Sequence, residues 1–180
     1  PEQGEVLVTG ASGGVGSVAI TLLNALAYQV VAVTGRSENT NALKKLGATR
    51  VISRDEMLTE NKSLDSQLWA GVIDTVGSHI LAKALSQTQY EGVVAACGLA
   101  AGVDLPTTVM PFILRGVKLV GIDSVYCSHE RRLIAWQRLA ELLPASFYEH
   151  ACEQIALEQV TDYASKIIQG QVKGRVVIKL

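Results

Sequence analysis

The sequence predicts an α/β fold, a Rossmann-type doubly wound parallel sheet between two layers of helices, in a three-layer αβα single domain. Short apolar runs rich in β-branched residues alternate with helical patterns from Glu5 to Cys97, as in strand–helix–strand units with right-handed crossovers. The 180 residues are 48% hydrophobic and their mean hydropathy is +0.26. This composition is typical of strands buried on both faces, and the length suits one core.

Five strands are predicted in the first part of the chain, each a short apolar run bounded by turn residues. They are Glu5–Thr9, Gln29–Thr34, Arg50–Ser53, Gly71–Thr75 and Gly92–Cys97. Helices are expected between them at Ser17–Ala27, Asn39–Leu46, more weakly near Glu56–Trp69, and at His79–Gln87. Gly47 follows two lysines and marks the end of the second helix, because glycine and nearby cations favour a helix C-terminus.

The alternation changes after Cys97. The segment Gly98–Thr108 is typical of a loop, and an apolar stretch at Val109–Leu114 follows it. The remaining expected elements are a strand at Lys118–Val125, an amphipathic helix at Glu130–Leu143 ended by Pro144, a helix at Leu157–Gln169 and a final strand at Arg175–Leu180. No internal repeat or low-complexity tract interrupts residues 1–180, so we expect one domain.

A glycine-rich turn follows the first strand without a spacer. The residues are Thr9-Gly10-Ala11-Ser12-Gly13-Gly14-Val15-Gly16, and a helical pattern starts at once. This order of strand, glycine turn and helix places bare backbone and unpaired N–H groups next to a dinucleotide pyrophosphate. A P-loop is excluded because no Lys-Ser/Thr follows the glycines. Ser12, Gly13, Gly14, Val15 and Gly16 are therefore candidate cofactor-binding residues, and a plain tight turn is the alternative.

The end of the second strand indicates which dinucleotide is bound. An NAD-binding fold places Asp or Glu here to hold the ribose 2′-hydroxyl, whereas this chain has Thr34-Gly35-Arg36-Ser37. Glycine leaves room, and a guanidinium beside hydroxyls can bind a 2′-phosphate. Thr34, Gly35 and Arg36 therefore favour NADPH. The alternatives are that Arg36 is a solvated surface residue, or that Glu38 serves as the ribose acid.

Two more loops are expected at the same edge of the sheet, because ligands of doubly wound sheets lie at the carboxyl ends of the strands. The predicted cofactor contacts there are Thr75 and Val76 after the fourth strand, and Cys97, Gly98 and Leu99 after the fifth. Asp74 is equally well explained as a cap of the next helix. Arg175, at the entrance to the last strand, is a further candidate that could reach a phosphate or an acyl group.

Composition excludes several classes of function. The formal net charge is −1, which argues against binding to nucleic acid or a membrane surface, and no apolar run is long enough to span a membrane. Cys97, Cys127 and Cys152 have neither disulfide-framework nor zinc-cluster spacing, so we expect free thiols, no metal site and a cytoplasmic location. No signal peptide is expected, and the short polar start of the chain suggests a domain excised from a longer protein.

Isolated polar and aromatic residues are expected to have ordinary roles. The three histidines, His79, His129 and His150, are scattered without ligand spacing and are interpreted as surface or helix-cap residues. Trp69 and Trp136 are interpreted as packing anchors. No catalytic residue is assigned within the chain, because no nucleophile–base or acid–base constellation is present.

The glycine turn also fits the T-G-x-x-x-G-x-G pattern of short-chain dehydrogenases, which additionally require a Tyr-x-x-x-Lys pair. Tyr163-Ala164-Ser165-Lys166 has the wrong spacing. The chain instead resembles the cofactor domain of medium-chain dehydrogenases/reductases, within which it is similar to the zinc-free quinone oxidoreductases of the YhdH/AcuI-type branch, which includes acryloyl-CoA reductases. The resemblance covers the whole chain and is carried by residues 11–19, 34–36, 46–48, 74–77, 111–124 and 174–177.

The resemblance implies a function that this chain supplies only in part. It implies the NADPH-binding domain of a two-domain oxidoreductase, with a catalytic domain that is not in this chain. The enzyme would transfer hydride to the β-carbon of an α,β-unsaturated carbonyl compound, either an enoyl thioester such as acryloyl-CoA or a quinone. It also implies a homodimer formed through the strand at Lys118–Val125, and little turnover by this chain alone. A non-catalytic NADP-sensing module is the alternative from another class.

Overall fold

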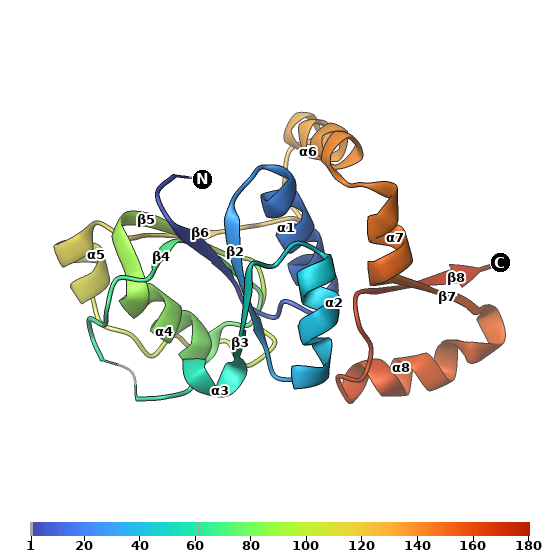
Figure 1. Ribbon diagram of the computed structural model, residues 1–180, viewed down its shortest axis with the longest axis horizontal. Coiled ribbons are helices and arrows are strands. Elements are labelled where there is room, and N and C mark those ends of the chain that lie inside the picture. Colours follow the sequence, from blue (N-terminus) through green and yellow to red (C-terminus); the bar gives the residue numbers. More distant parts are fainter. Residues whose placement is uncertain (1, 61) are drawn as a thin grey trace.

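The computed structural model describes residues 2–60 and 62–180. Its centre is a six-stranded, all-parallel sheet with the strand order β3-β2-β1-β4-β5-β6, seen edge-on through the middle of Figure 1. The strands are β1 (Glu5–Val8), β2 (Gln29–Thr34), β3 (Arg50–Ser53), β4 (Trp69–Asp74), β5 (Thr88–Ala96) and β6 (Lys118–Gly121). The order reverses between β1 and β4, so the predicted doubly wound sheet is confirmed.

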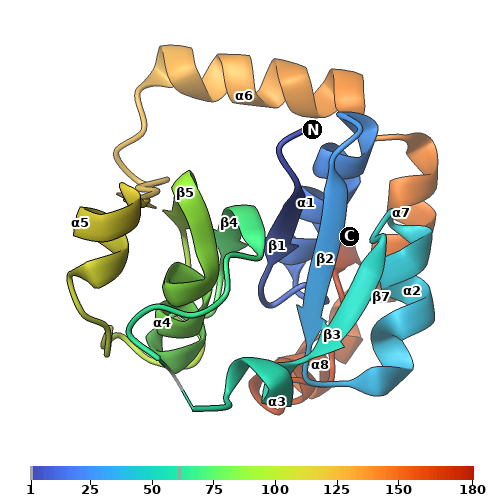
Figure 2. The same ribbon diagram turned by 60° about the vertical axis from the view of Figure 1, so that its left-hand side comes forward.

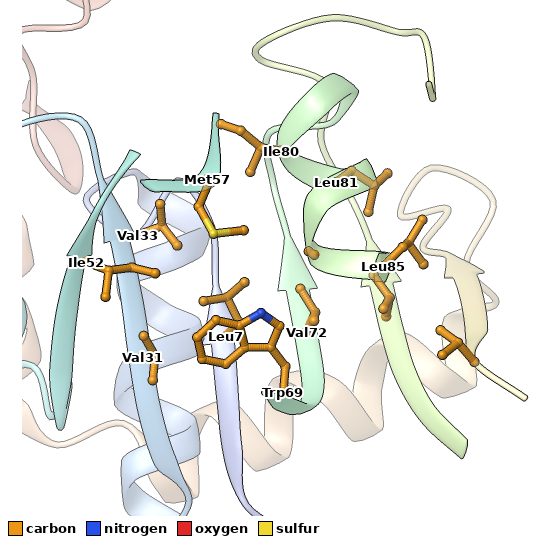
Figure 3. Packing of buried hydrophobic residues seen from close by; sticks show 13 residues of the cluster. Leu7, Val31, Val33, Ile52, Met57, Trp69, Val72, Ile80, Leu81 and Leu85 are labelled. Atoms are coloured by element: carbon orange, nitrogen blue, oxygen red, sulfur yellow. The ribbon is translucent and has the colours of Figure 1, made fainter. Parts of the chain in front are cut away.

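One face of the sheet is covered along its whole width. The helices on it are α3 (Arg54–Met57), α4 (Ser78–Gln87) and α5 (Met110–Arg115). Figure 3 shows the apolar side chains between these helices and the strands, with the indole of Trp69 among them. The cluster reaches from Ile52 on β3 to Val94 on β5 and Val117 just before β6. We call this the sealed face.

The opposite face is covered only over β1, β2 and β3. Helices α1 (Gly14–Ala25), α2 (Thr40–Lys45) and α7 (Ala145–Ala151) lie there, with the 3₁₀ turn η1 (Ser37–Asn39) before α2. Beyond them, Val93 on β5 is 44% exposed and Val120 on β6 is 43% exposed. We call this the half-covered face. A cavity of about 540 Å³ lies between α1 and the ends of β4 and β5.

The last part of the chain forms its own small unit. Helix α6 (His129–Leu142) lies across one end of the molecule, from the side of α5 to that of α7 (Figure 2). The strand β7 (Cys152–Ala156) then pairs in parallel with β8 (Arg175–Lys179) in a separate two-stranded sheet, joined through η2 (Leu157–Gln159) and α8 (Val160–Ile168). Figure 1 shows this sheet set apart from the main one. The sequence analysis missed α7 and β7.

Two predicted elements were wrong in extent. The weak helix near Glu56–Trp69 is real only as the single turn α3, and residues 58–60 and 62–68 are irregular. Tertiary hydrogen bonds hold this segment: Lys83 donates to the Glu60 carbonyl at 2.9 Å and to the Asp65 carboxylate at 2.7 Å, and Arg115 donates to the Asp65 carbonyl. These tertiary contacts override the local helix propensity of the segment.

The strand expected at Lys118–Val125 ends at Gly121. The Asp123 side chain accepts hydrogen bonds from the backbone N–H groups of Val125 at 2.9 Å and Tyr126 at 3.1 Å. Such an Asx turn bends the chain out of the extended conformation. The two tryptophans also differ: Trp69 is 2% exposed and is a packing anchor as predicted, but Trp136 is 64% exposed and the prediction for it was wrong.

Candidate functional site

The candidate site lies at the carboxyl ends of the central strands. There the loops after β1, β2, β3, β4 and β5 surround a cleft of about 470 Å³. Its walls include backbone of the glycine turn, the end of β2, two arginines and the C-terminal unit. The lining residues are Gly10, Ser12, Val33, Thr34, Gly35, Arg36, Arg54, Val76, Ile80, Ala100, Ala101, Gln169 and Gly170. Position and shape match the ligand crevice of a doubly wound sheet.

The glycine turn has a conformation that side chains would prevent. Gly10 has φ +57°, and its amide oxygen accepts a hydrogen bond from the Gly13 N–H at 2.9 Å. A Cβ on Gly16 would lie 2.5 Å from the Gly10 carbonyl oxygen and 2.7 Å from the Cα of Ala11. Gly16 is thus required for helix α1 to pack against the turn, and it is buried.

The N-terminus of α1 is free to meet an anion. Its N-cap is Gly13, no side chain caps it, and no acidic residue lies in its first turn. The N–H groups of this turn and the positive end of the helix dipole suit a pyrophosphate. The guanidinium of Arg175 lies directly over Gly14, since a Cβ there would be 1.1 Å from the arginine Nη1. Arg175 is therefore close enough to share an anion with the helix N-terminus.

A second group of residues lies around the end of β2. The Arg36 guanidinium donates to the carbonyl of Gly170 and approaches Ser12 Oγ and the Val172 carbonyl, both at 3.5 Å. The Thr34 hydroxyl accepts from the Arg36 N–H at 3.2 Å. The alternative interpretation of Arg36 as a solvated surface residue is therefore wrong. Instead, Arg36 connects the glycine turn to the loop before β8.

Arg54 belongs to the same group and was missed by the sequence analysis. It opens α3, directly after β3. A Cβ on Gly35 would lie 2.9 Å from the central guanidinium carbon of Arg54, so Arg54 covers Gly35 and lines the cleft with Arg36. The pairing that brings Arg54 here is seen only in the structure: β3 pairs with β2 in parallel, and their carboxyl ends meet at one edge. Two guanidiniums that line one cleft are suited to binding a dianion.

The loops after β4 and β5 pack closely against each other. A Cβ on Gly98 would lie 2.3 Å from the Thr75 carbonyl oxygen, and the Ala101 N–H donates to the Val76 carbonyl at 2.8 Å. Of the predicted contacts here, only Val76 lines the main cleft. Leu99 is 64% exposed. Thr75 and Gly98 contact each other and hold the two loops together.

Cys97 lies on the other side of the glycine turn. With Gly14, Val15 and Arg175 it lines the 540 Å³ cavity beside α1. Its Sγ donates to the Asp74 carbonyl at 3.3 Å. Burial, and secondarily the negative charge of Asp74, raises the pKa of the Cys97 thiol above its usual range. The predicted site residues are therefore divided between two hollows, with Gly13 and Gly16 in the turn that separates them.

Asp74 is fully buried at the end of β4. Its carboxylate accepts hydrogen bonds from the Thr9 hydroxyl at 2.7 Å and from the N–H groups of Val76 at 3.3 Å and Gly77 at 2.8 Å. Burial raises the pKa of Asp74, and these three donors act in the opposite direction. The N-cap residue of α4 is Gly77, so Asp74 satisfies that residue's N–H rather than capping the helix itself.

The described part of the chain, residues 2–60 and 62–180, has scattered histidines and cysteines. No group of three or more His, Cys, Asp or Glu side chains within those ranges is arranged to hold a metal ion. All three cysteines are free thiols, and His79, His129 and His150 are exposed as expected. Among the helices of the same described ranges, none is both long and apolar enough to cross a membrane.

Known proteins are similar to this chain in sequence and in fold. A probable acrylyl-CoA reductase AcuI of Escherichia coli is 56% identical over all of this chain and 55% of its own length. The crystal structure of the yhdH oxidoreductase from Salmonella enterica in complex with NADP has a TM-score of 0.97 at 56% identity, covering 100% of this chain and 55% of that one. The chain spans about half the length of the curated relatives it matches.

A third relative carries the other cofactor. The putative quinone oxidoreductase YhfP of Bacillus subtilis is 46% identical over 100% of this chain and 55% of its own length, and its crystal structure with NAD bound has a TM-score of 0.94, with the same coverage of both chains. These similarities confirm the resemblance to the YhdH/AcuI-type branch of the medium-chain reductases. Residues 14–141 match the zinc-binding dehydrogenase family, and the chain belongs to this family.

Proposed function

We propose that residues 1–180 form the NADPH-binding domain of an oxidoreductase that reduces the double bond of an α,β-unsaturated carbonyl compound. The observation that carries the proposal is the cleft at the carboxyl ends of the strands, lined by Ser12 of the glycine turn, Arg36 and Arg54, with the uncapped N-terminus of α1 following directly after that turn. Relatives named as acrylyl-CoA reductase and quinone oxidoreductase support an enoyl thioester such as acryloyl-CoA, or a quinone, as the acceptor.

The preference for NADPH over NADH follows from the end of β2. No acidic side chain lines the cleft to bind a ribose 2′-hydroxyl, whereas Arg36 and Arg54 flank Gly35 and can pair with a 2′-phosphate. One similar structure holds NADP and another holds NAD, so the preference proposed for this chain rests on its own residues.

When bound, the reduced nicotinamide supplies the hydride that reduces the β-carbon of the acceptor. The residues of this chain bind and orient the cofactor. Backbone N–H groups of Gly13, Gly14, Val15 and Gly16 meet the pyrophosphate, and Arg175 adds a cation beside them. Thr75, Val76, Cys97, Gly98 and Leu99 border the nicotinamide end. No catalytic residue and no zinc ligand is proposed within this chain, and the domain with those residues would be the chain's own catalytic domain.

The comparisons favour this function over its alternatives. Membership of a dehydrogenase family and similarity to named reductases favour an enzyme over a non-catalytic NADP-sensing module. The position of Tyr163 also argues against the short-chain dehydrogenase alternative, which would need this tyrosine at the site. Tyr163 lies on α8 and donates a hydrogen bond to Glu153 on β7, outside the cleft. Small-molecule acceptors, rather than nucleic acid or membranes, remain the proposed partners. We further propose a cytoplasmic location, which the free thiols support.

The cofactor proposal is tested by titrating NADPH and NADH onto the full-length protein that contains this chain. We expect Arg54→Ala and Arg36→Ala each to weaken NADPH binding roughly 10- to 100-fold, because each removes a charge-assisted hydrogen bond. Binding of NADH should change little. Arg131→Ala, on the exposed surface of α6, is the matched control. Equal affinity of the unmodified protein for both cofactors would contradict the assignment.

The reaction is tested by NADPH oxidation in the presence of acryloyl-CoA and, in parallel, a quinone. We expect turnover with at least one acceptor by the full-length protein and little turnover by residues 1–180 alone. Absence of NADPH oxidation with both acceptors in the full-length protein would exclude the proposed reaction.

We also propose a homodimer formed through Lys118–Val125. β6 is an edge strand of the sheet, and apolar residues next to it are exposed, among them Ile122 at 51% and Val125 at 77%. An unpaired strand edge is a template for pairing, and a second copy of the chain can pair with it around a two-fold axis. Ile122→Lys, which places like charges across that axis, should dissociate the full-length dimer in sedimentation experiments. A monomeric unmodified protein would rule the dimer out.

A further inference from the structure

Three of the strand-end loops that border the candidate site are joined by one buried polar cluster. Its side chains are Thr9, at the end of the first strand, and Asp74 and Thr75, at the end of β4. Thr9 and Asp74 have no exposed surface. Neither side chain lines the cleft itself, so neither is explained by direct contact with a ligand there.

Thr9 uses its hydroxyl in both directions. The hydroxyl donates to Asp74 Oδ1 at 2.7 Å and accepts from the Thr75 N–H at 3.0 Å. The Thr75 hydroxyl in turn donates to the Thr9 carbonyl at 3.0 Å. These three bonds fix the start of the glycine turn to the start of the β4 loop. Since the cluster is buried, a lost partner would leave unpaired polar groups away from water, which costs about 1–3 kcal/mol each.

Asp74 extends the cluster to the third loop. Its Oδ2 holds the N–H groups of Val76 and Gly77, and its own carbonyl accepts from the Cys97 N–H at 2.9 Å. Thus one residue contacts the loops after β4 and β5 directly, and the loop after β1 through Thr9. The side chain of Thr75 also rests on the turn, because a Cβ on Gly10 would lie 2.1 Å from Thr75 Oγ1.

These loops have different proposed tasks. The turn after β1 meets the pyrophosphate, whereas Thr75, Val76 and Cys97 border the nicotinamide end. The separation between the two loops therefore sets where the nicotinamide lies once the pyrophosphate is bound. A displacement of about 1 Å between reacting groups can slow a reaction roughly 100-fold, so a rigid link between these loops matters to the reaction more than to binding.

We propose that Thr9 and Asp74 are positioning residues that hold the glycine turn and the β4 loop in register for hydride transfer. This inference rests on the proposed function, because it concerns the same cofactor. Thr9 acts through Asp74 and Thr75 and touches no ligand. The adenosine half of the cofactor is bound by Arg36 and Arg54, which are independent of the cluster.

The test uses the full-length protein with Thr9→Val, which removes the hydroxyl at nearly constant shape, and Thr9→Ser, which restores it. We expect Thr9→Val to lower kcat roughly 10- to 100-fold while the Kd of NADPH, measured by its fluorescence, changes less than about 3-fold. Thr9→Ser should recover most of the activity. Thr88→Val is the matched control: Thr88 is equally buried and its hydroxyl donates to the Ala84 carbonyl at 2.8 Å, at the other end of the sheet.

A second readout does not depend on turnover. Amide hydrogen exchange at Thr75 should accelerate at least 10-fold in Thr9→Val, because its acceptor is gone, and stay unchanged in Thr88→Val. If Thr9→Val does not fold, Asp74→Asn replaces it, with faster exchange expected at Val76 or at Thr75, since one amide group cannot accept all three bonds. If the unmodified protein oxidises NADPH with neither acceptor, the proposed function fails and amide exchange still tests the link.

With an active unmodified protein, an unchanged kcat in Thr9→Val would overturn the inference. A rise in Kd at constant kcat would overturn it as well, because the cluster would then serve binding alone. Unaltered exchange at Thr75 would show that the loops are not held through Thr9.

Discussion

The two faces of the central sheet differ in how completely they are covered. On the sealed face, α3, α4 and α5 bury side chains from β3 to β6 in one continuous cluster. On the half-covered face, α1, α2 and α7 bury only the β1–β3 part, and Val93 and Val120 stay 44% and 43% exposed. Since a parallel sheet is normally buried on both faces, the bare part departs from the usual pattern, and the sealed face indicates what this chain stabilises by itself.

The difference also separates stability from function. The main cleft and the 540 Å³ cavity both open at the carboxyl edge of the sheet, and the cavity continues onto the half-covered face beside α1. Apolar side chains of α6, including Leu133 and Trp136, are exposed as well. Substitutions on the sealed face should therefore change the free energy of unfolding strongly, whereas equivalent substitutions on the bare part should not.

The largest contrast is expected between the two tryptophans. Trp69→Ala removes an indole that is 2% exposed and whose Nε1 donates to Gln87 Oε1 at 3.1 Å. It should lower the free energy of unfolding by about 3–5 kcal/mol through the cavity that it leaves. Trp136→Ala, at 64% exposure, should change it by no more than about 0.5 kcal/mol. Urea unfolding followed by circular dichroism measures the free energy of unfolding of both variants, and equal effects would contradict the contrast between the buried and the exposed tryptophan.

A finer comparison uses neighbours on one strand. Val94 is fully buried on the sealed face and Val93 points to the half-covered face. Val94→Ala should cost about 2 kcal/mol of unfolding free energy, since it deletes two buried methyl groups and leaves a small cavity. Val93→Ala should cost less than about 0.5 kcal/mol in the isolated chain. In the full-length protein, a larger cost at Val93 would identify β5 as part of an interface.

The smallest effect on the free energy of unfolding is expected from the hydrogen bonds that hold the irregular segments 58–60 and 62–68 beside α4. The hydrogen bond from Lys83, first among several causes, lowers the pKa of Asp65. A lowered carboxyl pKa contributes stability that is present above the unfolded value of about 4 and is lost as pH falls through the folded value. Lys83→Met should therefore destabilise by about 1.5 kcal/mol at pH 7. The part due to Asp65 should disappear in strongly acidic solution.

The dependence of stability on pH is measured from the urea midpoints of the unmodified chain and of Lys83→Met, at pH 7 and in strongly acidic solution. A stability difference that grows as the pH falls below 4 would have the wrong sign for a lowered carboxyl pKa. Lys166→Met is the control, because Lys166 lies over the half-buried ring of Tyr163 on α8, outside the main core.

The first half of the fold could be predicted well from the sequence. Strands β1 to β5 and helices α1, α2 and α4 lie where periodicity and turn residues predicted them, within a few residues. The failures have physical causes. The helix expected near Glu56–Trp69 yielded to hydrogen bonds from Lys83 and Arg115, and the strand expected to reach Val125 is ended by the Asp123 turn.

The candidate site was foreseen in its local parts and missed where it depends on the sheet. Glycines that require a special backbone, as at Gly10 and Gly16, can be recognised from the turn that contains them. Arg54 could not be chosen among the arginines without the pairing of β2 with β3, which brings it to Gly35. The contact between Arg36 and the Gly170 loop joins residues 134 positions apart, and no local pattern indicates it.

By itself, the sequence determined the order of strands and helices, the glycine turn and the Gly35-Arg36 pair directly after β2, because these follow from side-chain periodicity and backbone sterics within a few residues. Only the tertiary structure decided that β8 pairs with β7 instead of joining the main sheet, that half of one face stays bare, and that Thr9 meets Asp74. These depend on which distant segments come together, and that is settled by the packing and hydrogen bonding of the whole chain.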